Sequence, residues 1–123
     1  MGVYVGWALD RGERETLLAR FPPRYARAVA DHVTLAFEPA APKLPLETMG
    51  EIVGEADDGS GVQALVVRIG GTTDRPDGST YHITWSLADG RRAVESNDVI
   101  RDHGWRAFEA PIPLSLTPRL FRP

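Results

Sequence analysis

Two tetrapeptides of the same form, His32-Val33-Thr34-Leu35 and His82-Ile83-Thr84-Trp85, stand in the stretches 31–37 and 81–87 of the chain. Both stretches alternate in polarity and are rich in β-branched and aromatic residues, which predicts a strand in each. Because side chains alternate across a strand, the His and the Thr of each motif point to one face and the apolar residues to the other. Each motif therefore presents an imidazole and a hydroxyl side by side.

If the two strands lie near each other, the cleft between them holds two imidazoles and two hydroxyls. That set suits cleavage of a phosphodiester: one His takes a proton from the attacking water and the other gives a proton to the departing oxygen. The hydroxyls of Thr34 and Thr84 would donate hydrogen bonds to the non-bridging phosphate oxygens. The sequence leaves open whether His32 or His82 is the base, and it also allows that all four are ordinary strand residues.

The pattern on both sides of the motifs predicts a mixed fold. We expect a strand over Val3–Ala8, a helix over Glu13–Phe21 and a further helical turn over Arg24–Ala30. A loop from Glu38 to Pro45 should follow the first motif. Next comes a hairpin, with strands over 51–56 and 62–69 around the turn Asp57–Gly61.

The remaining elements are shorter. The polar stretch 70–80 contains the turn signal Arg75-Pro76-Asp77-Gly78 and leads into the second motif. A short helix starting at Ser96 or Asn97 should end at Gly104, and the proline-punctuated stretches 105–112 and 114–120 predict an edge strand and a tail. The order of elements is typical of an α+β protein. At 123 residues we expect a single domain, 1–123.

Composition limits the functions that the chain can have. The sequence contains no cysteine, which excludes disulfides, thiolate zinc sites and a cysteine nucleophile. No stretch approaches the ~18 apolar residues of a membrane span, and Met1-Gly2-Val3-Tyr4 lacks the features of a signal peptide, so we expect a cytoplasmic protein without a membrane partner. The net charge of −3 argues against a broad grip on nucleic acid but allows a nucleic-acid end in a small cleft.

The paired motifs resemble the two His-x-Thr/Ser signatures of the 2H phosphoesterase superfamily. The likeness extends to Tyr4-Val5-Gly6-Trp7, to Asp31–Phe37 and to Arg75–Leu87, which are similar to the cyclic phosphodiesterase domain of plant and fungal-type tRNA ligases. It covers most of the chain, from Tyr4 to about Leu116. The resemblance implies two pseudo-symmetric lobes of antiparallel strands around a central cleft, with helices outside.

The resemblance also implies an activity: hydrolysis of a 2′,3′-cyclic phosphate at an RNA 3′ end or on a cyclic nucleotide, to a 2′-phosphate, without metal or cofactor. The catalytic set that carries over is His32, Thr34, His82 and Thr84. We expect the protein to act as a monomer. Two alternatives remain open: a module that binds RNA ends without turnover, and a 2H enzyme for another phosphoester, such as 2′,5′-linked oligonucleotides.

Three more residues are candidates for substrate binding. Tyr4 is out of phase with the apolar residues of its strand and can face the cleft and stack on a base, or else pack in the core. Arg75 can bind a neighbouring phosphate or remain a solvated turn residue. Ser86 shares its strand face with Thr84, as Ala36 does with Thr34, and can add a hydrogen bond to the substrate or be a plain strand serine.

The other chemistries have little support. The third histidine, His103, stands near a helix end and reads as structural. A metal set from the histidines lacks ligand spacing, and Asp31 should lie on the opposite strand face from His32. Trp7 and Trp85 should face the core. No phosphate-binding glycine loop is present.

Overall fold

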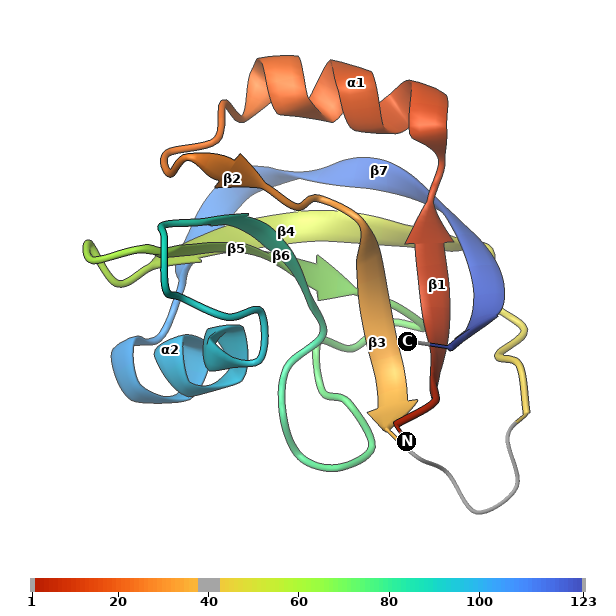
Figure 1. Cartoon of the computed structure of the whole chain (residues 1–123). Coiled ribbons are helices and arrows are strands. Elements are labelled where there is room, and N and C mark those ends of the chain that lie inside the picture. The colour runs from red at the N-terminus through yellow and green to blue at the C-terminus, as the bar shows by residue number, and fades with distance from the viewer. Residues whose placement is uncertain (1, 38–42, 123) are drawn as a thin grey trace.

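The computed structural model describes residues 2–37 and 43–122 and confirms an α+β fold, with a seven-stranded antiparallel sheet and two helices (Figure 1). The strands follow the order β2-β6-β5-β4-β7-β1-β3. Their bounds are β1 Tyr4–Leu9, β2 Arg27–Ala28, β3 His32–Phe37, β4 Met49–Asp57, β5 Val62–Arg68, β6 His82–Leu87 and β7 Arg106–Phe121. Within the described ranges, no helix has the length and apolar character needed to cross a membrane.

Local chemistry marks the start of the first helix and the end of the second. The first helix, α1, covers Arg11–Arg20, close to the predicted 13–21, and the carboxylate of Asp10 caps it by accepting the Glu13 amide. The second helix, α2, covers Glu95–His103. It ends at Gly104, whose φ of 73° lies in the left-handed region that glycine tolerates best.

The predicted helical turn over Arg24–Ala30 is wrong, because this segment completes the edge of the sheet. Arg27–Ala28 forms β2 against β6. The pairing continues with hydrogen bonds from the Val29 amide to the Trp85 carbonyl and from the Ala30 amide to the Thr84 carbonyl. An unpaired edge of β6 would leave its backbone groups without partners, and this tertiary requirement overrides local helix propensity.

The hairpin is confirmed as β4 and β5, but the prediction of an edge strand and a tail after Trp105 is wrong. Residues 106–121 form one strand, β7, that pairs with β4 through its first part and with β1 through its last six residues. At Pro113 and Pro118 the strand has only one paired neighbour, so a missing amide proton is tolerated as on an edge strand. The prolines thus reflect locally free edges within a strand that joins both halves of the sheet.

The curved sheet separates two apolar clusters and brings its two motif strands together. One cluster, which contains Trp7 and Trp85, lies under α1; both tryptophans are buried, as predicted. The other cluster packs α2 against β4 and β5. Although β3 and β6 are far apart in the strand order, they contact each other across the curve (Figure 1). Of the predicted loop Glu38–Pro45, residues 38–42 lie outside the described residues.

Candidate active site

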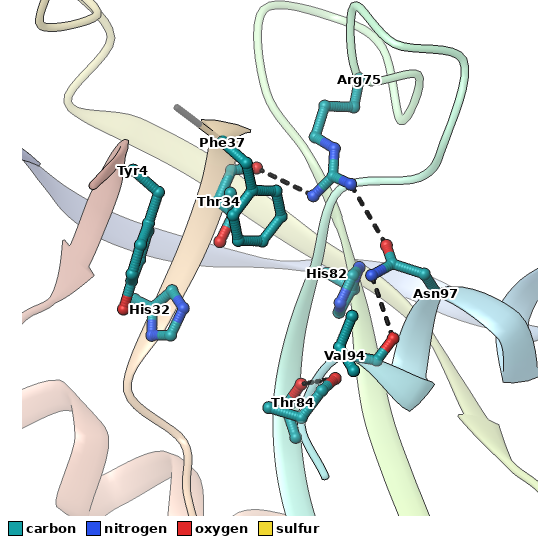
Figure 2. Close-up of a pocket in the computed structure, with 10 residues that line it drawn as sticks. Tyr4, His32, Thr34, Phe37, Arg75, His82, Thr84, Val94 and Asn97 are labelled. Carbon is teal, nitrogen blue, oxygen red and sulfur yellow. Dashed lines mark hydrogen bonds between the residues drawn. The ribbon is translucent and has the colours of Figure 1, made fainter. Parts of the chain in front are cut away.

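The four residues of the two motifs line one cavity of about 240 Å³ between β3 and β6. His32 and Thr34 form the wall on β3, and His82 and Thr84 form the wall on β6 (Figure 2). Tyr4 and Arg75, both predicted from the sequence, also line it. The lining is completed by residues that the motifs did not predict: Phe37, Ala93, Val94 and Asn97.

A β-bulge follows the Thr in both motifs. On β3, Thr34 pairs with Gly6 and Ala36 pairs with Val5, so that Leu35 has no partner. On β6, Thr84 pairs with Ala64 and Ser86 pairs with Gln63, so that Trp85 has no partner on β5. An extra residue shifts the alternation of the strand beyond it. Each motif therefore keeps its His and Thr on the cavity face, while the residues after the bulge exchange faces.

The bulge on β3 explains why the prediction for Ala36 is wrong. Phe37 lines the cavity and Ala36 does not. The pairing is possible because Gly6 approaches the bulged backbone closely: a Cβ at Gly6 would lie 2.1 Å from the Val33 carbonyl oxygen. No pattern in 31–37 signals the shift, but the glycine opposite it does.

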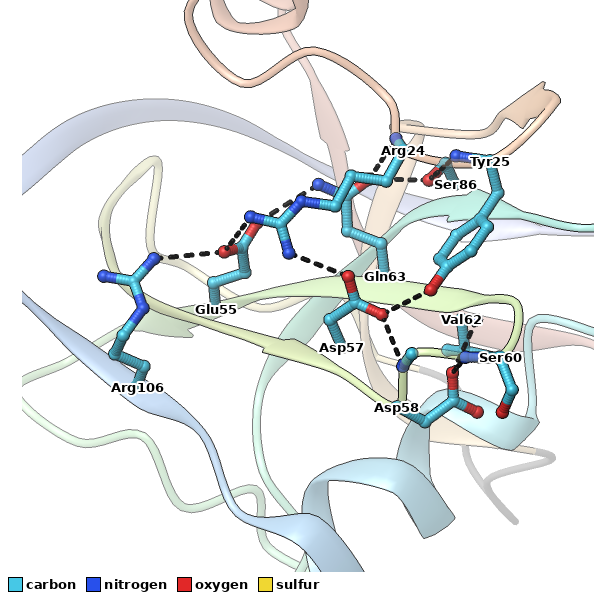
Figure 3. A network of polar contacts seen from close by, with 11 residues as sticks. Arg24, Tyr25, Glu55, Asp57, Asp58, Ser60, Val62, Gln63, Ser86 and Arg106 are labelled. Carbon is cyan, nitrogen blue, oxygen red and sulfur yellow. Dashed lines mark hydrogen bonds and ion pairs between the residues drawn. The ribbon is translucent and has the colours of Figure 1, made fainter.

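The bulge on β6 likewise moves Ser86 out of the cavity, so its prediction as a substrate-binding residue is wrong. Ser86 is fully buried, donates a hydrogen bond of 2.6 Å to the Gln63 Oε1 atom and accepts the Tyr25 amide at 3.2 Å. It belongs to a polar network that ties the segment before β2 to the sheet (Figure 3). The network includes Arg24, which pairs with Glu55 and Asp57.

His82 is buried and held as a neutral imidazole. Its Nδ1 atom lies 2.8 Å from the Thr80 carbonyl oxygen, which can only accept, so Nδ1 carries the proton. Burial lowers the pKa of His82 to about 4; the hydrogen bond to Thr80 opposes this shift, and the nearby charge of Arg75 adds to it. At neutral pH the Nε2 atom of His82 is therefore a free proton acceptor.

His32 is more exposed and has a carboxylate as its partner. Its Nδ1 atom lies 3.1 Å from Asp31 Oδ2, and the other oxygen of Asp31 accepts a hydrogen bond of 2.7 Å from Arg11. Burial alone would raise the pKa of Asp31, but the hydrogen bonds from Arg11 and His32 outweigh it and the pKa is lowered. The prediction that Asp31 lies away from His32 is wrong, because β3 begins at His32 and strand alternation does not reach Asp31.

The two threonines differ in what they contact. The Thr34 hydroxyl has no hydrogen-bond partner among the described residues, although its backbone carbonyl faces Arg75 at 3.5 Å. The Thr84 hydroxyl lies 2.8 Å from the buried Ser96 hydroxyl and donates to the Ala93 carbonyl oxygen at 3.3 Å. Both partners of Thr84 come from α2 and the turn before it, which fixes that hydroxyl in place.

Arg75 places a positive charge in the wall of the cavity. Its side chain is only 4% exposed, and its guanidinium donates to Asn97 Oδ1 at 3.2 Å and to both oxygens of Asp77 at 3.3 Å. The alternative of a solvated turn arginine is therefore wrong. Asn97, on α2, holds the guanidinium from the other side, a role that the sequence did not suggest (Figure 2).

The mouth of the cavity is apolar. Phe37 and Val94, each 53% exposed, both line the cavity and come from β3 and from the residue before α2. Beside them the Tyr4 ring lies 5.3 Å from the His32 ring and stacks on Phe121 at 4.8 Å. Tyr4 thus lines the cavity as predicted, with one face of its ring already covered.

Comparisons of the chain with models of known protein families, with curated proteins and with solved structures found no match. Over 2–37 and 43–122, no group of three or more His, Asp or Glu side chains is arranged to hold a metal ion. His103 is the last residue of α2, is exposed and does not line the cavity of the two motifs.

Proposed function

We propose that this chain is a 2H phosphoesterase that hydrolyses 2′,3′-cyclic phosphates at the ends of RNA or on nucleotides. The observation that carries the proposal is the pair of imidazoles in one cavity, each fixed through Nδ1 to a different kind of acceptor. One acceptor is a carboxylate and the other a carbonyl. This difference supports one imidazole as proton donor and the other as proton acceptor.

His82 is the general base in this proposal. Its Nε2 atom takes a proton from water as the water oxygen attacks phosphorus. The low pKa of His82 keeps that nitrogen unprotonated at neutral pH, and the hydrogen bond to Thr80 fixes the tautomer. A base with so low a pKa is weak, so the phosphate must be strongly polarised by the groups around it.

His32 is the general acid. Its Nε2 proton passes to the ring oxygen that leaves phosphorus as the P–O bond breaks, which opens the cyclic phosphate to a monoester. The carboxylate of Asp31 accepts the Nδ1 proton and balances the positive charge of the ring before transfer. After one turnover His82 holds the extra proton and His32 lacks one, and exchange with water restores both.

Three groups are placed to hold the phosphate oxygens. The Thr34 hydroxyl lines the cavity and has no hydrogen-bond partner in the part of the chain that the structure describes, so it can donate to the phosphate. The Thr84 hydroxyl can turn its proton from the Ala93 carbonyl, 3.3 Å away, to a phosphate oxygen while Ser96 keeps its own hydrogen bond. Arg75 supplies positive charge in a site largely shielded from water, where electrostatic stabilisation of the transition state is strongest.

The apolar mouth supports a nucleotide as the substrate. Phe37 and Val94 leave large apolar surfaces exposed on either side of the entrance, and unpaired bases stack on such surfaces. With the cyclic phosphate between the histidines, the base of the same nucleotide would lie between these two side chains. The 2′-phosphate as product, and two pseudo-symmetric lobes as the frame, rest on the family resemblance and on the matching bulges of the two motifs.

The test is hydrolysis in the presence of a chelator. The substrates are 2′,3′-cyclic AMP and an oligoribonucleotide with a cyclic phosphate end, and the products are separated as 2′- and 3′-phosphates. The wild type is expected to open both, whereas His32→Ala and His82→Ala should not. His103→Ala is the matched control, because this histidine lies outside the cavity and should retain full activity.

Each other outcome has a clear meaning. Failure of the wild type on both substrates would remove the proposal, and tight binding of the uncleaved oligonucleotide would then favour the alternative of a binding module. Activity on 2′,5′-linked oligonucleotides alone would favour the other 2H substrate. Hydrolysis that survives in both histidine variants would remove the mechanism.

A further inference from the structure

We propose that a groove along α2 binds the nucleotide that precedes the cyclic phosphate terminus, so that the protein prefers an RNA end to a free cyclic mononucleotide. This inference rests on the proposed function for the position of the terminal nucleotide. The groove has a volume of about 440 Å³. Its walls are α2, the turn at residues 77–80 and Trp105.

The groove borders the cavity of the two motifs. Asn97 lines both the cavity and the groove. The cavity is also lined by residues just before α2, whereas the groove extends to Gly104 and Trp105 at the other end of the helix. A helix of nine residues spans about 14 Å, a length that fits one or two nucleotides of single-stranded RNA. In the proposed complex, the RNA strand passes Asn97 as it leaves the cavity and enters the groove.

Trp105 supplies the stacking surface. Its indole is 38% exposed, whereas Trp7 and Trp85 are buried. One side of the ring rests on the backbone of Gly54, where a Cβ would lie only 2.3 Å from the indole Cε3 atom. The ring is thus held by a close backbone contact and leaves apolar surface open to the groove, the arrangement that single-stranded nucleic-acid sites use to stack a base.

The charges in the groove favour recognition of a base and sugar over a phosphate. Arg101 is already paired with Asp98 and Asp102 at 3.1 and 2.9 Å. Asp77 is anionic, because the Ser79 hydroxyl bond and other contacts lower its pKa to about 2. Affinity in the groove should therefore come from stacking and depend little on salt.

The first experiment compares two substrates on one set of variants. The ratio of kcat/KM for adenylyl-adenosine with a terminal 2′,3′-cyclic phosphate to that for 2′,3′-cyclic AMP is measured. Trp105→Ala should lower this ratio about tenfold, on the scale of one lost stacked base, and Trp105→Phe should restore most of it. Leu46→Ala, which changes an exposed apolar side chain outside both hollows, should leave the ratio unchanged. An unaltered ratio in Trp105→Ala would overturn the inference.

The second experiment uses only the wild-type protein and does not depend on catalytic turnover. Because Trp105 is the exposed tryptophan of the three in the chain, a stacked base should quench the part of the wild-type fluorescence that solvent quenchers reach. Adenylyl-adenosine 2′-phosphate should quench it with saturation at concentrations where adenosine 2′-phosphate does not. Absence of quenching by the dinucleotide would remove the groove even if both substrates are hydrolysed. Quenching without hydrolysis would keep the groove and remove the catalytic proposal.

Discussion

The two motifs of this chain have the same sequence pattern and the same bulge, yet they have different surroundings. In the first motif, His32 is partly exposed and its Nδ1 contacts a carboxylate, while the Thr34 hydroxyl has no hydrogen-bond partner among the described residues. In the second motif, His82 is buried against a carbonyl, and the Thr84 hydroxyl is held by Ser96. The comparison shows that one local pattern yields two chemical environments when different elements pack against it.

The difference comes from what covers each strand. The first motif lies at one end of the strand order, where β3 pairs only with β1, so water reaches His32. The second motif lies between β5 and β2 and is covered by α2 and the loop that carries Arg75. Burial against a carbonyl keeps the imidazole of His82 neutral, whereas His32 is in contact with both water and a carboxylate.

The largest expected effect is loss of either histidine. Replacement of His32 or His82 by Ala should lower kcat by about 10²- to 10⁴-fold, the usual contribution of a positioned proton donor or acceptor. The two variants should differ in stability, because loss of His82 opens a buried space and leaves the Thr80 carbonyl unpaired, while the side chain of His32 is 23% exposed.

Steady-state kinetics and urea unfolding of the same samples test both statements. Equal destabilisation by His32→Ala and His82→Ala would contradict the difference in burial between the two motifs. The base assignment would fail if His82→Ala retained most of the wild-type kcat.

The next effect is the pH dependence of stability that arises from the buried imidazole of the second motif. His82 titrates at about 4 in the folded protein, against its ordinary value of 6.5. Between these values the unfolded chain binds more protons, so the free energy of unfolding falls as the pH drops from 6.5 to 4, by about 3 kcal/mol in total. Chemical denaturation at several pH values measures this loss.

His82→Gln should remove that part of the pH dependence, because glutamine does not titrate, and His32→Gln serves as the matched control that retains it. The difference between the wild-type and His82→Gln curves cancels the carboxylates that titrate in the same range in both chains. Equal slopes for wild type and His82→Gln would show that His82 is not held neutral by burial. The acid side of the kcat/KM profile should extend to about pH 4 for the same reason.

Much of the fold could be predicted from local pattern. The period of two in 31–37 and 81–87, the turn at 57–61 and Gly104 each mark an element whose signal lies within a few residues. The segment 24–30 and the last strand could not be predicted, because their conformation satisfies backbone groups of strands distant in sequence. Prolines in β7 looked like signs of an edge strand, and they mark the places where only one neighbour pairs.

The site shows the same division. Strand alternation holds up to each bulge, so it correctly places His32, Thr34, His82 and Thr84 on the cavity face. Beyond each bulge, alternation predicts the wrong face for Ala36 and Ser86. Three residues of the site were missed, each for its own reason. The contact of Asp31 with His32 depends on the exact residue at which the strand begins, and Phe37 reaches the cavity because the bulge shifts the register. Asn97 comes from a helix elsewhere in the chain. Of these three features, only the shift in register had a local signal in the sequence, which is the glycine opposite the first bulge.

The threonines should separate catalysis from stability. Thr34→Val removes a hydroxyl with no partner in the described part of the chain, so it should leave the free energy of unfolding unchanged and lower kcat about 10- to 100-fold, the scale of a hydrogen bond to a charged group. Thr84→Val should lower kcat and also destabilise the fold by about 1–3 kcal/mol, because the buried Ser96 hydroxyl loses its partner.

Ser96→Ala is the control for the second threonine, since it keeps the Thr84 hydroxyl but no longer holds it. We expect a reduction in kcat smaller than that of Thr84→Val. Equal destabilisation by Thr34→Val and Thr84→Val would show that the Thr34 hydroxyl has a hydrogen-bond partner. It would also contradict the difference between the two motifs.

The smallest effect concerns Asp31, which acts through His32 and is therefore a positioning residue. Asp31→Asn keeps an oxygen that can accept the Nδ1 proton but removes the charge, so kcat should fall about fivefold, as expected for a charge-assisted hydrogen bond at a partly exposed site. KM should not change, because Asp31 does not line the cavity. Arg11→Met is the matched control: it removes the other partner of Asp31 and leaves the carboxylate on His32. A purely structural role for Asp31 would give a lower free energy of unfolding with kcat unchanged, whereas the proposed role predicts a lower kcat in a chain of wild-type stability. Only the second result supports His32 as the acid of the pair.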